Sequence, residues 1–168
     1  MALALAQAPD FSGTWRLDTG RSRIAPTAGL AGLAGAGAPD TLHVTQPANG
    51  TLVIESQINE SHARLYTSRT KIVTPVTVGP GGRVAMTSRW DGRTLVSEGT
   101  RESSSGTSTI VQEVKEVIGV SADGRTLTIE ITTQGPEATS TSTLMYTRIV
   151  DVGPCKTWQT PCKTPSSP

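Results

Sequence analysis

Apolar and polar residues alternate along most of this chain in short runs, and turn residues separate the runs. A period of two is typical of strands that bury one face, and the many Thr residues favour the same structure. No segment shows the period of an amphipathic helix. The pattern predicts about ten strands, or eight if two pairs fuse. The predicted strands span residues 9–17, 41–46, 51–58, 62–70, 71–78, 83–90, 93–100, 108–120, 125–133 and 140–150.

A turn pair followed closely by Thr-Leu recurs three times between these runs. The pairs are Asn49-Gly50, Asp91-Gly92 and Asp123-Gly124. Asn, Asp and Gly tolerate the positive φ of tight hairpin turns, so each copy predicts an antiparallel connection. The stretches 79–82 and 103–106, rich in Gly and Ser, predict further loops. The repetition therefore predicts a meander, in which neighbours in sequence are also neighbours in the sheet.

The second and third copies fit two-residue loops. In the second copy such a loop places Trp90 opposite Arg93, and in the third it places Val120 opposite Leu127. Both registers keep the apolar side chains of the two strands on one shared face, as a buried face requires.

The first copy needs a longer loop. With a two-residue loop at 49–50, Val44 would lie opposite Glu55, on the wrong face. A three-residue loop at 48–50 places Val44 opposite Ile54 instead. The sequence therefore predicts an odd-length loop with Gly50 in the left-handed region, forming a bulge.

These registers gather most apolar side chains on one face of the meander. Closing the meander into a barrel buries that face and removes exposed edges. The predicted fold class is therefore an all-β, antiparallel up-and-down meander closed into a single barrel of 8–10 strands. A barrel of this size has room for side chains and a small ligand. The candidate lumen residues are Leu52, Ile54, Ser56, Met86, Ser88, Trp90, Leu95, Ser97, Gln112, Val114, Glu116, Ile129 and Tyr146.

Several of these inward candidates are polar, namely Ser56, Ser88, Ser97, Gln112 and Glu116. The serines and the glutamine either line a partly wet lumen or lie at the barrel rims, and the pattern leaves both open. An inward Glu116 either hydrogen-bonds a ligand or a water, or marks a strand end or a bulge.

Composition and charge exclude several classes of function. The chain has 168 residues, enough for one domain with a core, and its 15 Lys+Arg against 14 Asp+Glu give a net charge of +1. Nucleic-acid binding would need a basic patch, and no apolar run reaches the roughly 20 residues of a membrane-spanning helix. Common catalytic and phosphate-binding motifs are absent, and Glu113 and Glu116 fall on opposite faces of one strand. We therefore expect no enzymatic activity, no metal and no cofactor.

Both ends of the chain indicate export. Ala4-Leu5-Ala6 fits the small-x-small site of a signal peptidase, so residues 1–8 are expected to be a signal-peptide remnant, the alternative being a chance Ala/Leu-rich start. In an exported protein, Cys155 and Cys162 predict one disulfide, with free thiols as the alternative. The expected location is secreted or periplasmic.

Two segments lie outside the predicted strands of the barrel domain at 9–150. The stretch 26–40 is rich in Gly and Ala and predicts a flexible surface loop, the alternative being a small helical lid over the barrel mouth. The tail at 151–168 is rich in Pro and carries Trp158 between its cysteines, where an aromatic side chain could anchor a protein partner.

The start Phe11-Ser-Gly-Thr-Trp15 resembles that of lipocalin-like (calycin) proteins. This resemblance implies that Arg148, near the end of the last strand, packs across Trp15. The chain from 9 to 150 also resembles exported bacterial lipocalin-like proteins, through 90–95 (Trp-Asp-Gly-x-x-Leu) and 121–128 (Ser-x-Asp-Gly-x-Thr-Leu-Thr). A ten-stranded barrel of the fatty-acid-binding type fits the strand count equally. The Gly/Ala stretch and the Cys-bearing tail depart from the pattern.

The expected function is binding of a small apolar or amphiphilic ligand in the lumen. The alternative is an interaction module, such as a protease inhibitor or an envelope-surface protein, with a solidly packed barrel. We expect a monomer without a transmembrane segment and without nucleic-acid partners.

Overall fold

The computed structural model describes residues 9–25, 38–46, 51–56, 63–76 and 82–150. The expected signal-peptide remnant, most of the Gly/Ala-rich loop, and the tail with Cys155, Cys162 and Trp158 lie outside the described residues, as does Gly50. Among the residues that are described, the structure contains no helix that is long and apolar enough to cross a membrane.

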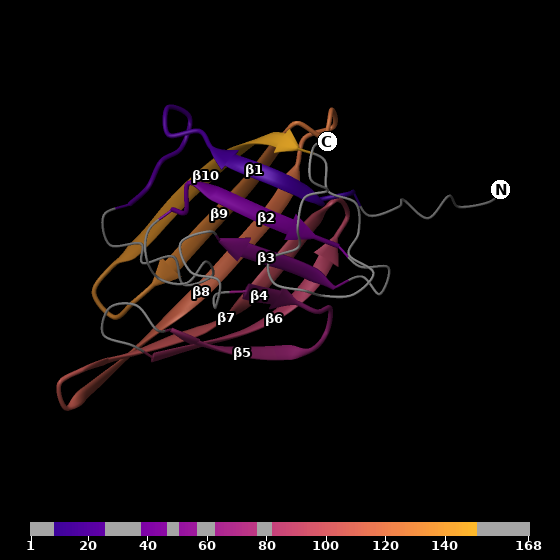
Figure 1. The fold of residues 1–168 in the computed structure, drawn as a ribbon. Helices are drawn as coiled ribbons and strands as arrows, with labels where there is room; N and C mark the ends of the chain where they lie inside the picture. The colour runs from indigo at the N-terminus through magenta and orange to yellow at the C-terminus, as the bar shows by residue number, and fades with distance from the viewer. Residues whose placement is uncertain (1–8, 26–37, 47–50, 57–62, 77–81, 151–168) are drawn as a thin grey trace.

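The described residues form ten antiparallel strands in one sheet (Figure 1). The sheet order is β4-β3-β2-β1-β10-β9-β8-β7-β6-β5, so the chain runs up and down and every pair but β1–β10 is consecutive in sequence. The predicted all-β barrel is confirmed, with ten strands. The strands are β1 (Gly13–Leu17), β2 (Thr41–Thr45), β3 (Leu52–Ser56), β4 (Ala63–Tyr66), β5 (Lys71–Val76), β6 (Gly82–Asp91), β7 (Thr94–Ser105), β8 (Ser108–Val120), β9 (Thr126–Gln134) and β10 (Thr139–Val150).

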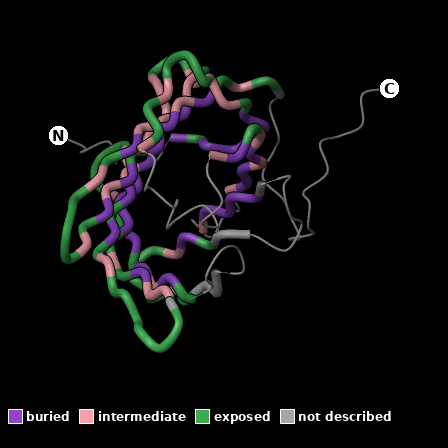
Figure 2. The backbone as a smooth tube through the Cα atoms, turned by 90° about the vertical axis from the view of Figure 1, so that its left-hand side faces the viewer, coloured by how far each residue is buried: buried purple, intermediate pink, exposed green. Residues whose placement is uncertain are grey.

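The sheet curls into a nearly closed barrel, and in Figure 2 the backbone traces a ring. Antiparallel pairing between β1 and β10 joins the two halves of the chain. The barrel remains incompletely hydrogen-bonded between β4 and β5, the two ends of the sheet order. The segment that connects β4 and β5 is joined to β6 instead, by a bridge between Ser68 and Ser88 and by the N–H of Arg69, at a φ of 63°, which donates to the Ser88 carbonyl at 2.9 Å.

Two of the three predicted hairpin registers are confirmed. In the first hairpin Val44 lies opposite Ile54, as a three-residue loop requires. In the third, Val120 lies opposite Leu127. The connection there is wider than two residues, because the N–H of Ser121 donates to the Thr126 carbonyl at 2.9 Å and closes the turn.

The predicted register of the second hairpin is wrong by two residues. Trp90 lies opposite Leu95, and the loop consists of Gly92 and Arg93, flanked by the pair Asp91–Thr94. Gly92 has a φ of 58°, and a type II′ turn favours Gly at its first central position. The shift is an even number, so the inward face stays the same.

Strand β7 is longer than predicted. Its residues 103–105, expected to be a loop, continue the strand, and the turn comes only at Gly106. Serine has no strong strand preference, but pairing of Ser103 with Ile110 and of Ser105 with Ser108 extends the ladder. Strands β7 and β8 together form a long hairpin that projects from the barrel wall in Figure 1.

Candidate functional site

Aromatic side chains gather at one end of the barrel, which we call the tryptophan end. Phe11 packs against Trp90 with ring centroids 5.6 Å apart, and its carbonyl accepts a hydrogen bond from Trp15 Nε1 at 3.0 Å. The Arg148 guanidinium lies over the Trp15 ring, 4.5 Å from the centroid, and donates to the Asp10 carbonyl at 3.0 Å. The expected packing of Arg148 across Trp15 is confirmed, and it is a cation–π contact.

An apolar row follows directly inside the tryptophan end. The register places Trp90, Leu95, Ile118, Ile129 and Leu144 side by side on β6 to β10, all facing inward. The four aliphatic members are completely buried. Burial of such side chains contributes about 1.5–3 kcal/mol each to folding, so this row is part of the core that holds the barrel together.

Two residues further along each strand, the inward row turns polar. We call Ser88, Ser97, Glu116 and Ser142 the polar row; the register aligns them across β6, β7, β8 and β10, with Ile131 between the last two. All four are buried, and Glu116 is 0% exposed. The hydroxyls of Ser88 and Ser97 form a hydrogen bond of 2.6 Å.

The polar row also takes part in hydrogen bonds with segments that are not neighbouring strands. The Tyr66 hydroxyl, from β4, donates to Glu116 Oε2 at 2.8 Å. Since β4 and β8 are not adjacent in the sheet, this bond crosses the interior. The N–H of Ala25 donates to Ser142 Oγ at 3.0 Å. Buried polar groups need such bonds, because leaving one without a partner costs about 1–3 kcal/mol.

Arg101 continues the polar inward surface toward the far end, the end that carries the β7–β8 and β9–β10 hairpins. It lies on β7 between Val84 of β6 and Gln112 of β8, and it is 9% exposed. Burial lowers the pKa of its guanidinium below the ordinary value of an arginine. Arginine nevertheless stays charged in proteins, so the inner wall carries a cation here.

A pocket of about 400 Å³ opens at the far end. The inward side chains of Gln112, Thr133 and Ser140 line it, and the Thr133 and Ser140 hydroxyls are 2.7 Å apart. Its size falls within the range of small-molecule pockets. The remaining lining residues are Ile110, Gly135, Pro136, Glu137 and Ala138.

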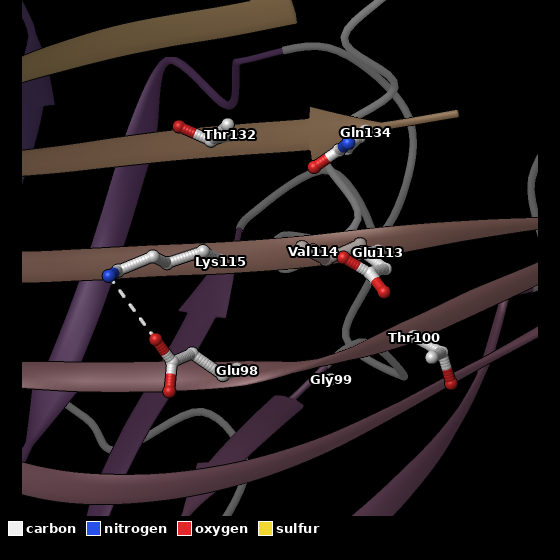
Figure 3. A pocket seen from close by; sticks show the side chains of 8 residues that line it. All are labelled: Glu98, Gly99, Thr100, Glu113, Val114, Lys115, Thr132 and Gln134. Carbon is white, nitrogen blue, oxygen red and sulfur yellow. Dashed lines mark ion pairs between the residues drawn. The ribbon is translucent and has the colours of Figure 1, made fainter. Parts of the chain in front are cut away.

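A second pocket, of about 390 Å³, lies on the outer face of β7, β8 and β9 (Figure 3). Its lining includes an ion pair in which Lys115 Nζ is 3.2 Å from Glu98 Oε1, while Arg89 is 2.7 Å from the other carboxylate oxygen. Hydrogen bonds from Arg89 and then Lys115 lower the pKa of the Glu98 carboxyl. These charged side chains are exposed and already paired with one another. They would therefore gain little from contacts with a ligand in place of contacts with water.

The candidate lumen residues fall into three groups. The apolar members Leu52, Ile54, Met86, Leu95, Val114, Ile129 and Tyr146 are buried. Ser88, Ser97 and Glu116 are buried in the middle of their strands, so neither a rim nor a strand-end position describes them. Trp90 and Gln112 are half-buried at opposite ends, and nothing is described for the side chain of Ser56.

Four buried, inward polar residues were not among the candidates, namely Tyr66, Arg101, Thr133 and Ser142. Arg101 was missed because the predicted strand ended at residue 100. The alternation through Leu95, Ser97 and Gly99 could have extended it by one more inward position.

Burial raises the pKa of the Tyr146 hydroxyl, which donates to the Pro39 carbonyl at 3.0 Å.

His43 lies on the outward face of β2, where it is half-buried. Its Nδ1 is 3.0 Å from Thr14 Oγ1, and its register partner Glu55 is buried too. Burial lowers the pKa of the His43 imidazole from its ordinary value of 6.5.

Within the described ranges, no group of three His, Cys, Asp or Glu residues is placed to hold a metal ion. Comparison of the chain with protein-family models, curated proteins and solved structures finds no match.

Proposed function

We propose that this protein is a non-catalytic binding barrel whose lumen takes a small amphiphilic or apolar molecule. The observation that carries the proposal is the polar inward surface that runs from Glu116 toward the pocket at the far end. A barrel shaped by stability alone would fill these positions with apolar side chains, because burying a carboxyl or a guanidinium is costly.

The two halves of the interior match the two parts of an amphiphile. Beyond the pocket, the inward side chains of Val114 and Ile131 offer contacts for a hydrocarbon portion. Toward the far end, Arg101 and Gln112 lie side by side on the inner wall, and Gln112 lines the pocket. The pocket itself offers the amide of Gln112 and the hydroxyls of Thr133 and Ser140, which favour a polar head group that forms hydrogen bonds.

Export is part of the proposal. It rests on the small-x-small site at 4–6 and on the spacing of Cys155 and Cys162. Fractionation of the native host, followed by mass determination of the mature chain with and without reductant, tests cleavage and the disulfide together. A full-length chain in the cytosol with both thiols free would contradict this part.

Native mass spectrometry of the protein purified from its own source is the first test of binding. The proposal expects a co-purifying small molecule that dissociates on activation in the gas phase. Titration with N-phenyl-1-naphthylamine, an apolar dye whose fluorescence rises on burial, extends the test to protein without a co-purified ligand.

Matched variants locate the dye. Ser140→Trp places an indole in the pocket, and Thr141→Trp makes the same change one residue later, on the outward face. We expect at least a tenfold loss of dye affinity in Ser140→Trp and none in Thr141→Trp, with far-ultraviolet circular dichroism confirming that both variants fold. Equal affinities in both variants, or no dye binding by the wild type, would favour the interaction module with a packed barrel.

A further inference from the structure

The β7–β8 hairpin leaves part of β8 without a second neighbour. Strand β8 begins at Ser108, but its pairing with β9 begins only at Glu113, opposite Gln134. Along 108–112, which we call the open edge, β8 pairs with β7 and with no other strand among the described residues. The hairpin that carries the open edge projects beyond the barrel wall in Figure 1.

The composition of the hairpin does not protect the open edge. From residue 103 to residue 112 the chain contains no charged residue and no proline. Ile110 and Val111 are 41% and 52% exposed and point to opposite faces of the hairpin. Proteins usually guard exposed edges with charges, prolines or bulges, because an unguarded edge is a template for another strand.

The backbone of the open edge has hydrogen-bonding groups to offer. The hairpin has a two-residue loop, so its flanking pair, Ser105 and Ser108, is a hydrogen-bonded pair of the ladder. Backbone groups of successive residues point to alternate sides of a strand. Thr109 and Val111 therefore direct their N–H and C=O groups away from β7, toward the open edge.

We propose that a second copy of this chain pairs with the open edge. In an antiparallel pair about a twofold axis, Ile110 lies opposite Ile110 of the second copy, and Thr109 lies opposite Val111. This register sets no like charges against each other and covers Ile110 and Val111 in both copies.

The absence of charged side chains on the open edge favours a second copy over a foreign peptide. The open edge carries no charged side chain that would recognise a partner of opposite charge, whereas a neutral edge is complementary to itself. The projection of the hairpin also keeps the two barrels apart when the edges meet. Pairing of five residues per copy makes a small interface, and small interfaces give weak, reversible association. The inference replaces the expectation of a monomer, and Ile110, which also lines the far-end pocket, places the open edge beside that pocket.

Sedimentation velocity over a concentration series from about 10 μM to about 1 mM tests the proposal, since this range brackets weak dimers. We expect the wild-type sedimentation coefficient to rise with concentration. Ile110→Lys, which sets two ammonium groups against each other across the axis, should stay monomeric throughout. Ile149→Lys is the matched control, because Ile149 is 42% exposed but lies on β10, away from the open edge, and it should associate like the wild type.

Hydrogen–deuterium exchange identifies the surface. The amide of Val111 should exchange more slowly at high concentration than at low concentration in the wild type and at equal rates in Ile110→Lys. A wild type that is monomeric at every concentration would overturn the proposal, and so would association that Ile110→Lys leaves unchanged.

Discussion

The tryptophan end and the polar row are both buried inside one barrel, yet they are built in opposite ways. At the tryptophan end the space is filled by Phe11, Trp15 and Trp90, and the Arg148 guanidinium lies over the Trp15 ring. Two residues further along each strand, the same inward positions hold small hydroxyls and Glu116. The first region is organised as a core, and the second is organised around hydrogen bonds.

Stability and function therefore depend on different regions of the barrel. Aromatic packing stabilises by burial and tolerates no loss of volume. A buried polar row contributes little net stability, since its hydrogen bonds only replace those to water. Changes at the tryptophan end should therefore alter folding, and changes toward the far end should alter binding more than folding.

Trp15→Ala should have the largest effect on stability. The indole is completely buried, so its removal leaves a cavity and also ends the contact with Arg148. We expect a loss of about 3–5 kcal/mol in the free energy of unfolding, measured by urea denaturation. A loss below about 1 kcal/mol would mean that the tryptophan end is not a packed core.

The Ser88–Ser97 pair tests the polar row through non-additivity. Ser97→Ala leaves the buried Ser88 hydroxyl without its 2.6 Å partner and should cost about 1–3 kcal/mol. The double variant Ser88→Ala/Ser97→Ala removes both hydroxyls and should be about as stable as the wild type. Unfolding curves for the three proteins decide the matter: a double variant that is less stable than Ser97→Ala would contradict this description of the row.

Arg148→Met should have a smaller effect than Trp15→Ala at the same end. Methionine keeps much of the side-chain volume and removes the cation from the ring, so we expect a loss of about 0.5–2 kcal/mol. Arg125→Met, at an exposed arginine in the β8–β9 turn, is the control and should change the stability little. Equal losses in the two variants would show that the cation–π contact contributes nothing measurable.

His43 should give the smallest effect, seen only as pH changes. Burial lowers the pKa of its imidazole below 6.5, so the folded state binds a proton less readily than the unfolded state. The free energy of unfolding should therefore be highest above about pH 6.5 and fall as the pH drops below it. His43→Gln should flatten the curve in that window, and an unchanged slope would exclude His43 as its source. The pKa values of the Glu98 and Glu102 carboxyls are lowered as well. Their effect on the free energy of unfolding is separate, because it appears only at pH values below their ordinary pKa of 4.5.

The fold could be predicted from the sequence because alternation and turn chemistry are local. The pairing of Val44 with Ile54 could be predicted because a three-residue loop keeps both apolar side chains inward. The register error at Gly92 arose because the Asp-Gly pair fits a turn starting at either residue, and both choices preserve the inward face. The face that a strand buries is therefore easier to predict than the register in which it pairs with its neighbour.

The candidate site was harder to predict because it is assembled across the barrel. Glu116 was expected to face inward, but its partner Tyr66 comes from β4, 50 residues earlier in the chain, and no local pattern links the two. Arg101 comes just before the Ser-rich stretch that indicated a loop, and its pairing with Val84 of β6 and Gln112 of β8 keeps it in the strand. A contact between distant strands, such as that of Tyr66 with Glu116, is invisible to a pattern of period two.

Methyl NMR of Ile- and Val-labelled protein, titrated with N-phenyl-1-naphthylamine, shows directly whether a small molecule enters the barrel. Ile118, Val114 and Ile131 point into the barrel, whereas Val111 and Val117 of β8 point outward. Binding in the lumen predicts that the dye shifts the three inward methyl groups and leaves the two outward ones unchanged. Shifts confined to Val111 and Val117 would place the dye on the outer face and contradict a binding barrel.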